Sequence, residues 1–239
     1  MTPKLYLIAG HTQGKDEGAQ NLQTKETENQ IARDLLLQVF PQVRDGIFAD
    51  ICPFDLTLEE KISWINKKAG SDDLVLSCHL NSSSKRTEKG AMIYYYGGSQ
   101  KSKEMAAKIL DAYCRATGIA NAGVQPDTAS RFERLGIVRD TRGWAFLLEL
   151  GSINNDLPTV KANGVKGILA AIQAVLGKAE DQPFIDVDRT HPYFSAADWA
   201  KKSGVASGYG DGRLGVDEPL TVGRFLAFLC KYDSVQKMG

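Results

Sequence analysis

Two histidines and a glutamate stand at or inside apolar runs of the sequence, and these residue types suit a catalytic metal site. His11 directly follows the first apolar run, His79 closes a second, and Glu149 lies inside a third. Neutral imidazoles together with a carboxylate bind catalytic Zn²⁺ and leave one coordination position open for water. Zinc lowers the pKa of that water toward ~7, and a carboxylate outside the metal shell can then serve as general base.

Each of these residues also has an ordinary structural interpretation. A histidine at a strand end is commonly a hydrogen-bonded loop residue, and a glutamate in an apolar strand can belong to a structural ion pair. Only three histidines occur in the chain, however, and two of them fall at such ends. A carboxylate inside an apolar strand is costly unless it is paired or functional. We therefore interpret His11, His79 and Glu149 together as a site, and the third histidine, His191, as a structural or surface residue.

The elements that position these residues alternate between strands and helices. Continuous apolar runs predict buried strands, and apolar residues spaced by three and four predict helices. The predicted strands are 5–9, 73–79, 90–96 and 145–150, and the predicted helices are 28–41, 58–69, 102–117 and 157–176. Pro41 is expected to close the first helix. This alternation predicts an α/β fold with a mostly parallel sheet, whose ligands bind at the carboxyl ends of the strands.

The composition limits the domain organisation and the class of partner. The 239 residues, 43% of them hydrophobic, can bury one core of ordinary size with room for a small appendage. Lysine plus arginine and aspartate plus glutamate each number 29, so the bulk charge does not favour nucleic acid as a partner. The four cysteines are widely spaced without a CxxC pair, which predicts reduced and mostly buried thiols.

Four short motifs follow one another in the sequence, each at a predicted strand end or the loop beside it. They are Ala9–Thr12, Lys15–Ala19, Ser77–Asn81 and Leu148–Asn155. In this order they resemble the zinc-dependent N-acetylmuramoyl-L-alanine amidases of autolysins and phage lysins. The resemblance implies a twisted, mostly parallel six-stranded sheet flanked by helices, with Zn²⁺ as cofactor. It also implies His11 and His79 as zinc ligands, Glu149 as the catalytic residue that activates water, and Asn81 as a residue of the substrate cleft.

The resemblance further implies the substrate, bacterial peptidoglycan, cut at the amide between N-acetylmuramic acid and the L-alanine of the stem peptide. A phage endolysin is the expected kind of enzyme. The alternatives are a catalytically inactive wall-binding protein with an amidase fold, which would have no use for Glu149 as a base, and another zinc amidohydrolase. The first apolar run is too short for a signal peptide or a membrane span. We therefore expect a protein made in the cytoplasm that acts on the cell wall after release.

The third zinc ligand has two candidates, Glu26 and Glu28, because the sequence departs from the family pattern here. The usual loop length after the first histidine selects Glu26. Helical phase selects Glu28, since it shares a face with the apolar residues of the first helix and points toward the sheet. A loop longer by two residues is easily accommodated, whereas shifting a helix by two residues rotates its apolar face by about 200°. We therefore predict Glu28, with Glu26 as the fallback.

A second pattern begins after a polar stretch that ends in a proline. We expect the catalytic domain at 1–177, a linker at 178–183 and a small helical C-terminal module at 184–239. Residues 184–221 resemble an S-layer homology repeat, which implies binding of a secondary cell-wall polymer. The usual Thr-Arg-Ala-Glu signature reads Thr221-Val-Gly-Arg224 here, and one repeat is present where three usually assemble. A helical packing or oligomerisation module is the alternative.

Overall fold

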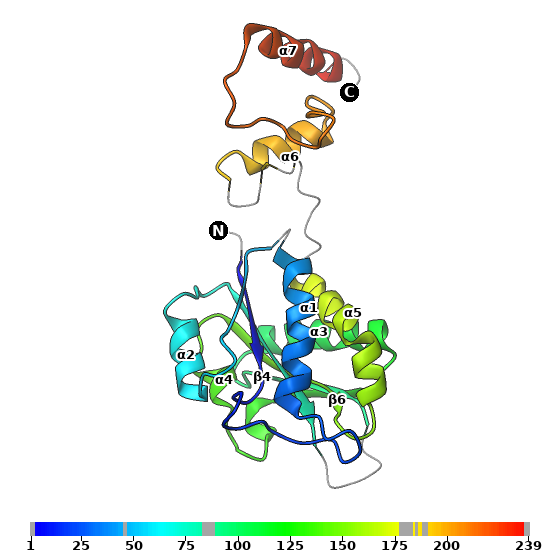
Figure 1. Ribbon diagram of the computed structural model, residues 1–239. Helices are drawn as coiled ribbons and strands as arrows, with labels where there is room; N and C mark the ends of the chain where they lie inside the picture. The colour runs from blue at the N-terminus through cyan, green and yellow to red at the C-terminus, as the bar shows by residue number, and fades with distance from the viewer. Residues whose placement is uncertain are drawn as a thin grey trace. The chain divides into compact units, whose positions relative to one another are not determined.

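The computed structural model describes residues 3–44, 47–82, 89–176, 184, 186–187 and 191–236. Contacts within the chain divide it into two compact units, Pro3–Lys178 and Ala179–Gly239 (Figure 1). The linker predicted at 178–183 lies outside the described residues. None of the described helices is long and apolar enough to cross a membrane.

The larger unit is built around a six-stranded sheet with the strand order β2-β1-β3-β6-β4-β5. The strands are β1 (Leu5–Ala9), β2 (Ala49–Ile51), β3 (Leu74–Asn81), β4 (Ala91–Tyr95), β5 (Asn121–Pro126) and β6 (Trp144–Ser152). Neighbouring strands pair in parallel, except that β4 and β6 are antiparallel. The predicted α/β fold with a mostly parallel sheet is confirmed.

Helices cover both faces of this sheet (Figure 1). They are α1 (Glu28–Arg44), α2 (Leu58–Asn66), α3 (Gln100–Thr117), the 3₁₀ turn η1 (Asp127–Ala129), α4 (Gly136–Arg139) and α5 (Leu157–Leu176). Because successive strand residues point to opposite faces, Leu5 and Leu7 enter the main core with α1, α3 and α5. Tyr6 and Ile8 enter a smaller core with α2 and α4. Both faces of the central strands are therefore buried.

The first helix continues past Pro41 to Arg44, so the prediction that Pro41 closes it is wrong. Proline removes one backbone donor, whose partner one turn earlier would be the carbonyl of Leu37. Leu37 is 51% exposed, so water can hydrate that carbonyl. The turn that includes Pro41 also places Val43 in the main core, and this burial offsets the lost hydrogen bond.

The two edge strands of the sheet are the elements that the sequence pattern did not predict. β2 has three residues, all half-buried, and β5 contains a glycine and ends in a proline. An edge strand needs neither a continuous apolar run nor a full set of backbone donors. Both strands therefore lack the signal by which the buried strands were found.

All four cysteines are free thiols, as the sequence predicts, but two of the four are buried where most were expected to be. Cys52 and Cys78 are buried, Cys114 is half-buried and Cys230 is exposed. Burial raises the pKa of Cys52 and of Cys78 to about 12. A thiol with such a pKa is a structural group and not a nucleophile at neutral pH.

The smaller unit contains two helices, α6 (Phe194–Lys202) and α7 (Val222–Gln236). Among its described residues the core consists of four buried apolar side chains, Phe184, Val187, Ala197 and Ala206. The carboxylate of Asp186 fixes the glycine-rich turn, because it accepts the backbone N–H of Leu214 at 2.7 Å and of Gly215 at 2.6 Å. So small a core makes this unit marginal by itself.

Candidate metal centre and active site

A tight turn at the end of β1 carries the first histidine. His11 has a φ of 59°, which places it in the left-handed region that residues other than glycine seldom adopt. Asn29 of α1 donates from Nδ2 to the carbonyl of Gly10 at 2.7 Å. Lys61 of α2, which is buried, donates from Nζ to the carbonyl of Ala9 at 2.8 Å and also to that of His11. Helices from both faces of the sheet thus hold the turn.

The ring of His11 is oriented by the loop that follows it. Nδ1 of His11 lies 2.9 Å from Oδ2 of Asp16, and Oδ1 of Asp16 accepts the backbone N–H of Gly18 at 3.1 Å. A Cβ on Gly18 would lie 2.5 Å from the histidine ring, so the loop packs directly against it. Metal-binding histidines commonly donate their second ring N–H to a carboxylate, which fixes the ring orientation. In this arrangement Nε2 of His11 is the atom available to a metal.

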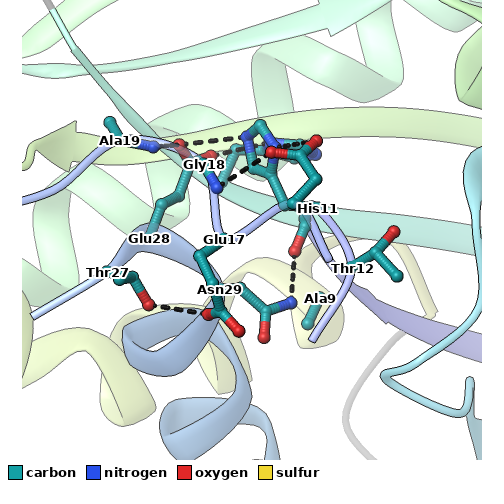
Figure 2. A network of polar contacts seen from close by, with 12 residues as sticks. Ala9, His11, Thr12, Glu17, Gly18, Ala19, Thr27, Glu28 and Asn29 are labelled. Carbon is teal, nitrogen blue, oxygen red and sulfur yellow. Dashed lines mark hydrogen bonds and ion pairs between the residues drawn. The ribbon is translucent and has the colours of Figure 1, made fainter. Parts of the chain in front are cut away.

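Glu28, the first residue of α1, lies between the two histidines. Its Oε2 is 3.1 Å from Nε2 of His11, and its Oε1 is 2.8 Å from Nδ1 of His79. Figure 2 shows the carboxylate of Glu28 directed at the ring of His11, with the backbone of Ala19 beside it. The backbone N–H groups of Ala19 and Leu80 donate to its two oxygens at 3.3 Å and 3.2 Å. One ligand atom from each of the three side chains lies within 4.8 Å of the others.

The two histidines favour an ionised Glu28 between their rings, against the effect of burial. The side chain of Glu28 is 6% exposed, against 27% for His11 and 17% for His79. Burial alone would raise the pKa of Glu28, but the hydrogen bonds from both histidines hold it well below its usual range. Burial alone would lower the pKa of His11, but its hydrogen bonds to Glu28 and Asp16 raise it to about 9. The cluster is therefore built around negative charge that attracts a cation.

The fourth residue is placed by the pairing of two neighbouring parallel strands. His79 of β3 pairs in register with Glu149 of β6, so both side chains leave the same face of the sheet. They open into a cleft of about 970 Å³ whose lining includes His11, Glu28 and Asn81. The carboxyl ends of β1, β3 and β6 meet at this edge, where parallel sheets bind their ligands.

Glu149 is half-buried, and the two oxygens of its carboxyl group differ in their surroundings. Its Oε2 is buried and has no hydrogen-bond partner among the residues that the structure describes. Burial raises the pKa of Glu149 to about 7; His79 opposes the rise and the charge of Glu28 adds to it. A carboxyl group with a pKa near neutrality can both accept and donate a proton at working pH. The structural ion pair considered for Glu149 is not formed with any described residue.

The remaining predicted residues lie as follows. Glu26 precedes α1 and pairs with Lys161 of α5 at 2.7 Å, outside the cluster. Asn81 ends β3 and its carbonyl accepts the backbone N–H of Ile153 at 2.9 Å. His191 belongs to the smaller unit, where its Nδ1 accepts the backbone N–H of Tyr193 at 3.2 Å.

Two residues with an evident part in the site were not singled out from the sequence. Asp16 lies inside the motif Lys15–Ala19, and this motif is the sequence signal that could have identified it. Lys61 could have been found by phase, because it shares one face of α2 with Ile65 and both are buried. A lysine among the apolar residues of a helix calls for a partner, which here is a pair of backbone carbonyls.

Comparison with known families agrees with this geometry. The family model described as N-acetylmuramoyl-L-alanine amidase matches residues 5–172, which is more than half of the chain. The chain belongs to the N-acetylmuramoyl-L-alanine amidase family. A second model, the S-layer homology domain, matches residues 183–221 of this amidase-family chain. The comparison with curated proteins gave no match.

Solved structures of amidases share the fold of this family member. The catalytic domain of the CD27L endolysin, described as targeting Clostridia difficile, is 26% identical with a TM-score of 0.58, covering 74% of this chain and 98% of its own. The catalytic domain of CwlV, an N-acetylmuramoyl-L-alanine amidase from Bacillus (Paenibacillus) polymyxa, is 24% identical with a TM-score of 0.59, covering 71% and 96%. The amidase AmiC2 of Nostoc punctiforme is 19% identical with a TM-score of 0.58, covering 72% and 93%.

Proposed function

We propose that this protein hydrolyses the amide between N-acetylmuramic acid and the L-alanine of the peptidoglycan stem peptide, with one Zn²⁺ ion as cofactor. The observation that carries the proposal is the cluster of His11, Glu28 and His79 beside Glu149, whose buried Oε2 has no partner among the described residues. A binding protein without catalysis would have no use for a carboxyl oxygen buried without a partner, because such burial is costly.

The donor set of the cluster fits zinc. Two imidazole nitrogens and one carboxylate oxygen are the ligands of many catalytic zinc sites, and His11, His79 and Glu28 offer them within 4.8 Å of one another. When bound, zinc supplies a Lewis acid that polarises the scissile carbonyl and lowers the pKa of water. Asp16 keeps the ring of His11 in place through Nδ1, so that Nε2 faces Glu28.

Glu149 moves the proton in the proposed reaction. Its carboxylate accepts a proton from the attacking water, whose oxygen bonds to the lactyl carbonyl carbon. The same proton then passes to the nitrogen of L-alanine as the carbon–nitrogen bond breaks, which yields a lactyl carboxylate and a free amine. The dry surroundings of Glu149, which raise its pKa to about 7, suit both halves of this transfer.

The setting of this activity is the bacterial cell wall. The likeness to the CD27L endolysin catalytic domain supports a role as a phage endolysin, made in the cytoplasm and acting on the wall after release. The match of residues 183–221 to the S-layer homology domain supports a wall-targeting module that binds a secondary cell-wall polymer. The catalytic domain at 1–177 and the module at 184–239 then act as separate domains.

Digestion of purified peptidoglycan tests the proposal directly. We expect new amino-terminal L-alanine without new reducing sugar ends, loss of this activity on chelation and recovery with Zn²⁺. Metal analysis of two matched variants tests the third ligand: Glu28→Ala should retain no zinc, whereas Glu26→Ala, which loses only the pair with Lys161, should retain one equivalent. Reducing ends without free alanine, or zinc kept by Glu28→Ala and lost by Glu26→Ala, would contradict it.

A further inference from the structure

One wall of the cleft is the segment between η1 and α4, which carries two arginines in different electrostatic situations. Arg131 and Arg134 both line the cleft. Arg134 forms an ion pair with Asp140. Arg131 is exposed and stacks its guanidinium 4.7 Å from the ring centre of Phe132, and no carboxylate of the described residues lies within ion-pair distance of it. Its positive charge is therefore not neutralised locally.

The charge of Arg131 acts on the reactive end of the cleft. Burial raises the pKa of both Glu149 and Tyr94, and in both cases the positive charge of Arg131 opposes the rise. Besides Arg131 and Arg134, the lining contains Lys61, which is buried and donates to the carbonyls of Ala9 and His11. Within the described part of the lining, Arg131 is thus the permanently charged group left to meet an anion.

The two sides of the scissile amide differ in charge, which decides what that anion is. On the glycan side the sugars are N-acetylated and the lactyl carboxyl group is consumed in the amide, so this side is neutral. On the peptide side the residue after L-alanine carries a free or amidated carboxyl group. A guanidinium pairs with a carboxylate through two parallel hydrogen bonds and is the side chain best suited to bind one.

We propose that Arg131 forms a subsite for the carboxylate of the residue that follows L-alanine, and so directs the peptide side of the substrate toward residues 130–135. This inference rests on the proposed amidase function. The exposed ring of Phe132, at 64%, offers an apolar surface beside the same subsite. The subsite makes the enzyme sensitive to amidation of that carboxyl group, a difference in charge at one position of the substrate.

Two synthetic muramoyl tripeptides, which differ only in whether that carboxyl group is free or amidated, test the subsite. We expect the parent enzyme to have a kcat/KM about tenfold or more higher for the free acid, as one charge-assisted contact provides. Arg131→Gln should lower kcat/KM for the free acid by about the same factor and leave the amidated substrate unchanged. Arg142→Gln is the matched control, because Arg142 is exposed and lies outside the cleft lining.

The outcomes separate this inference from the function on which it rests. A parent enzyme that cleaves neither substrate, under conditions where zinc is bound, overturns the amidase function and the subsite with it. A parent enzyme that cleaves both substrates equally, or an Arg131→Gln variant that loses the same factor on both, overturns the subsite alone. Thermal unfolding of each variant shows that an effect on rate does not come from a lost fold.

Discussion

At the scale of single residues, the site depends on one buried carboxylate that holds two histidines. Each oxygen of Glu28 contacts a different ring, at 3.1 Å for His11 and 2.8 Å for His79, and each also accepts a backbone N–H. Removing Glu28 would leave His11 with Asp16 as its carboxylate partner and take from His79 the carboxylate that contacts its ring. Glu149 differs from Glu28 because its buried oxygen has no partner at all among the described residues. Glu28 is therefore suited to bind a metal ion, and Glu149 is suited to accept a proton.

The Glu149→Gln variant tests this division. Glutamine keeps the shape and volume of the side chain but cannot accept a proton, so we expect the variant to fold, retain zinc and cleave peptidoglycan about 10²-fold or more slowly. The measurement is the initial rate of L-alanine exposure, together with zinc content. Glu104→Gln, an equal change of charge at an exposed position of α3, should keep the parent rate. A near-parent rate for Glu149→Gln would mean that the base lies elsewhere in the cleft.

At the scale of elements, the loop between β1 and α1 shapes the pocket of the first histidine. Thr12 and Asp16 form a β-bridge, and Glu17 accepts the backbone N–H of Gly14 at 2.7 Å. Glu17 also accepts the hydroxyl of Thr27 at 2.9 Å (Figure 2). These contacts close the loop on itself. They bring Gly18 against His11 and Asp16 to its Nδ1.

Two glycines of this loop give a matched pair of variants. Gly14 and Gly18 have φ values of 75° and 70°, so alanine at either position costs about 1–2 kcal/mol of stability. A Cβ at Gly14 meets nothing within 4 Å, whereas one at Gly18 would lie 2.5 Å from the ring of His11. We expect both variants to lower the melting temperature, but only Gly18→Ala to weaken zinc binding, measured by titration against a chelator. Equal zinc affinity in the two variants would show that the loop does not set the ring position.

At the scale of the whole molecule, the two units have separate cores. Every residue of the two cores of the larger unit lies before position 177. The core of the smaller unit is formed only by residues from position 184 onward. In the smaller unit, Glu218 binds both Arg213 and Arg224, at 3.1 Å and 3.2 Å, so these arginines carry their own counter-charge. The described cores of the two units thus share no residue.

Removal of residues 184–239 tests this independence. Because both cores of the larger unit consist of residues before position 177, we expect the shortened chain to stay soluble, bind one zinc ion and cleave purified peptidoglycan at the parent rate. Lysis of intact cells should fall, since the module that we propose to target the wall is gone. The measurements are zinc content, melting temperature, the rate of cleavage of purified peptidoglycan and the rate of lysis of intact cells. An insoluble or zinc-free product would show that the C-terminal residues belong to the fold of the catalytic unit.

The sequence by itself determined the parts of this protein that repeat a local pattern. Apolar runs predicted β1, β3, β4 and β6, the four strands inside the sheet, because burial selects such runs directly. Strand ends predicted that His11 and His79 meet at one edge, since parallel strands bring their carboxyl ends together. Helical phase predicted that Glu28 and not Glu26 faces the sheet, and Glu28 is 4% exposed.

Only the tertiary structure decided what depends on contacts between distant segments. The edge strands β2 and β5 take their form from pairing with a neighbour and show no apolar run of their own. The helix passes Pro41 because Val43 has a core to enter. Helical phase marks Lys61 as a buried cation, but the sequence does not show which groups surround Lys61 or Arg131. In the folded protein Lys61 donates to the carbonyls of Ala9 and His11, whereas Arg131 faces the cleft. The role of each charge follows from the groups that surround it.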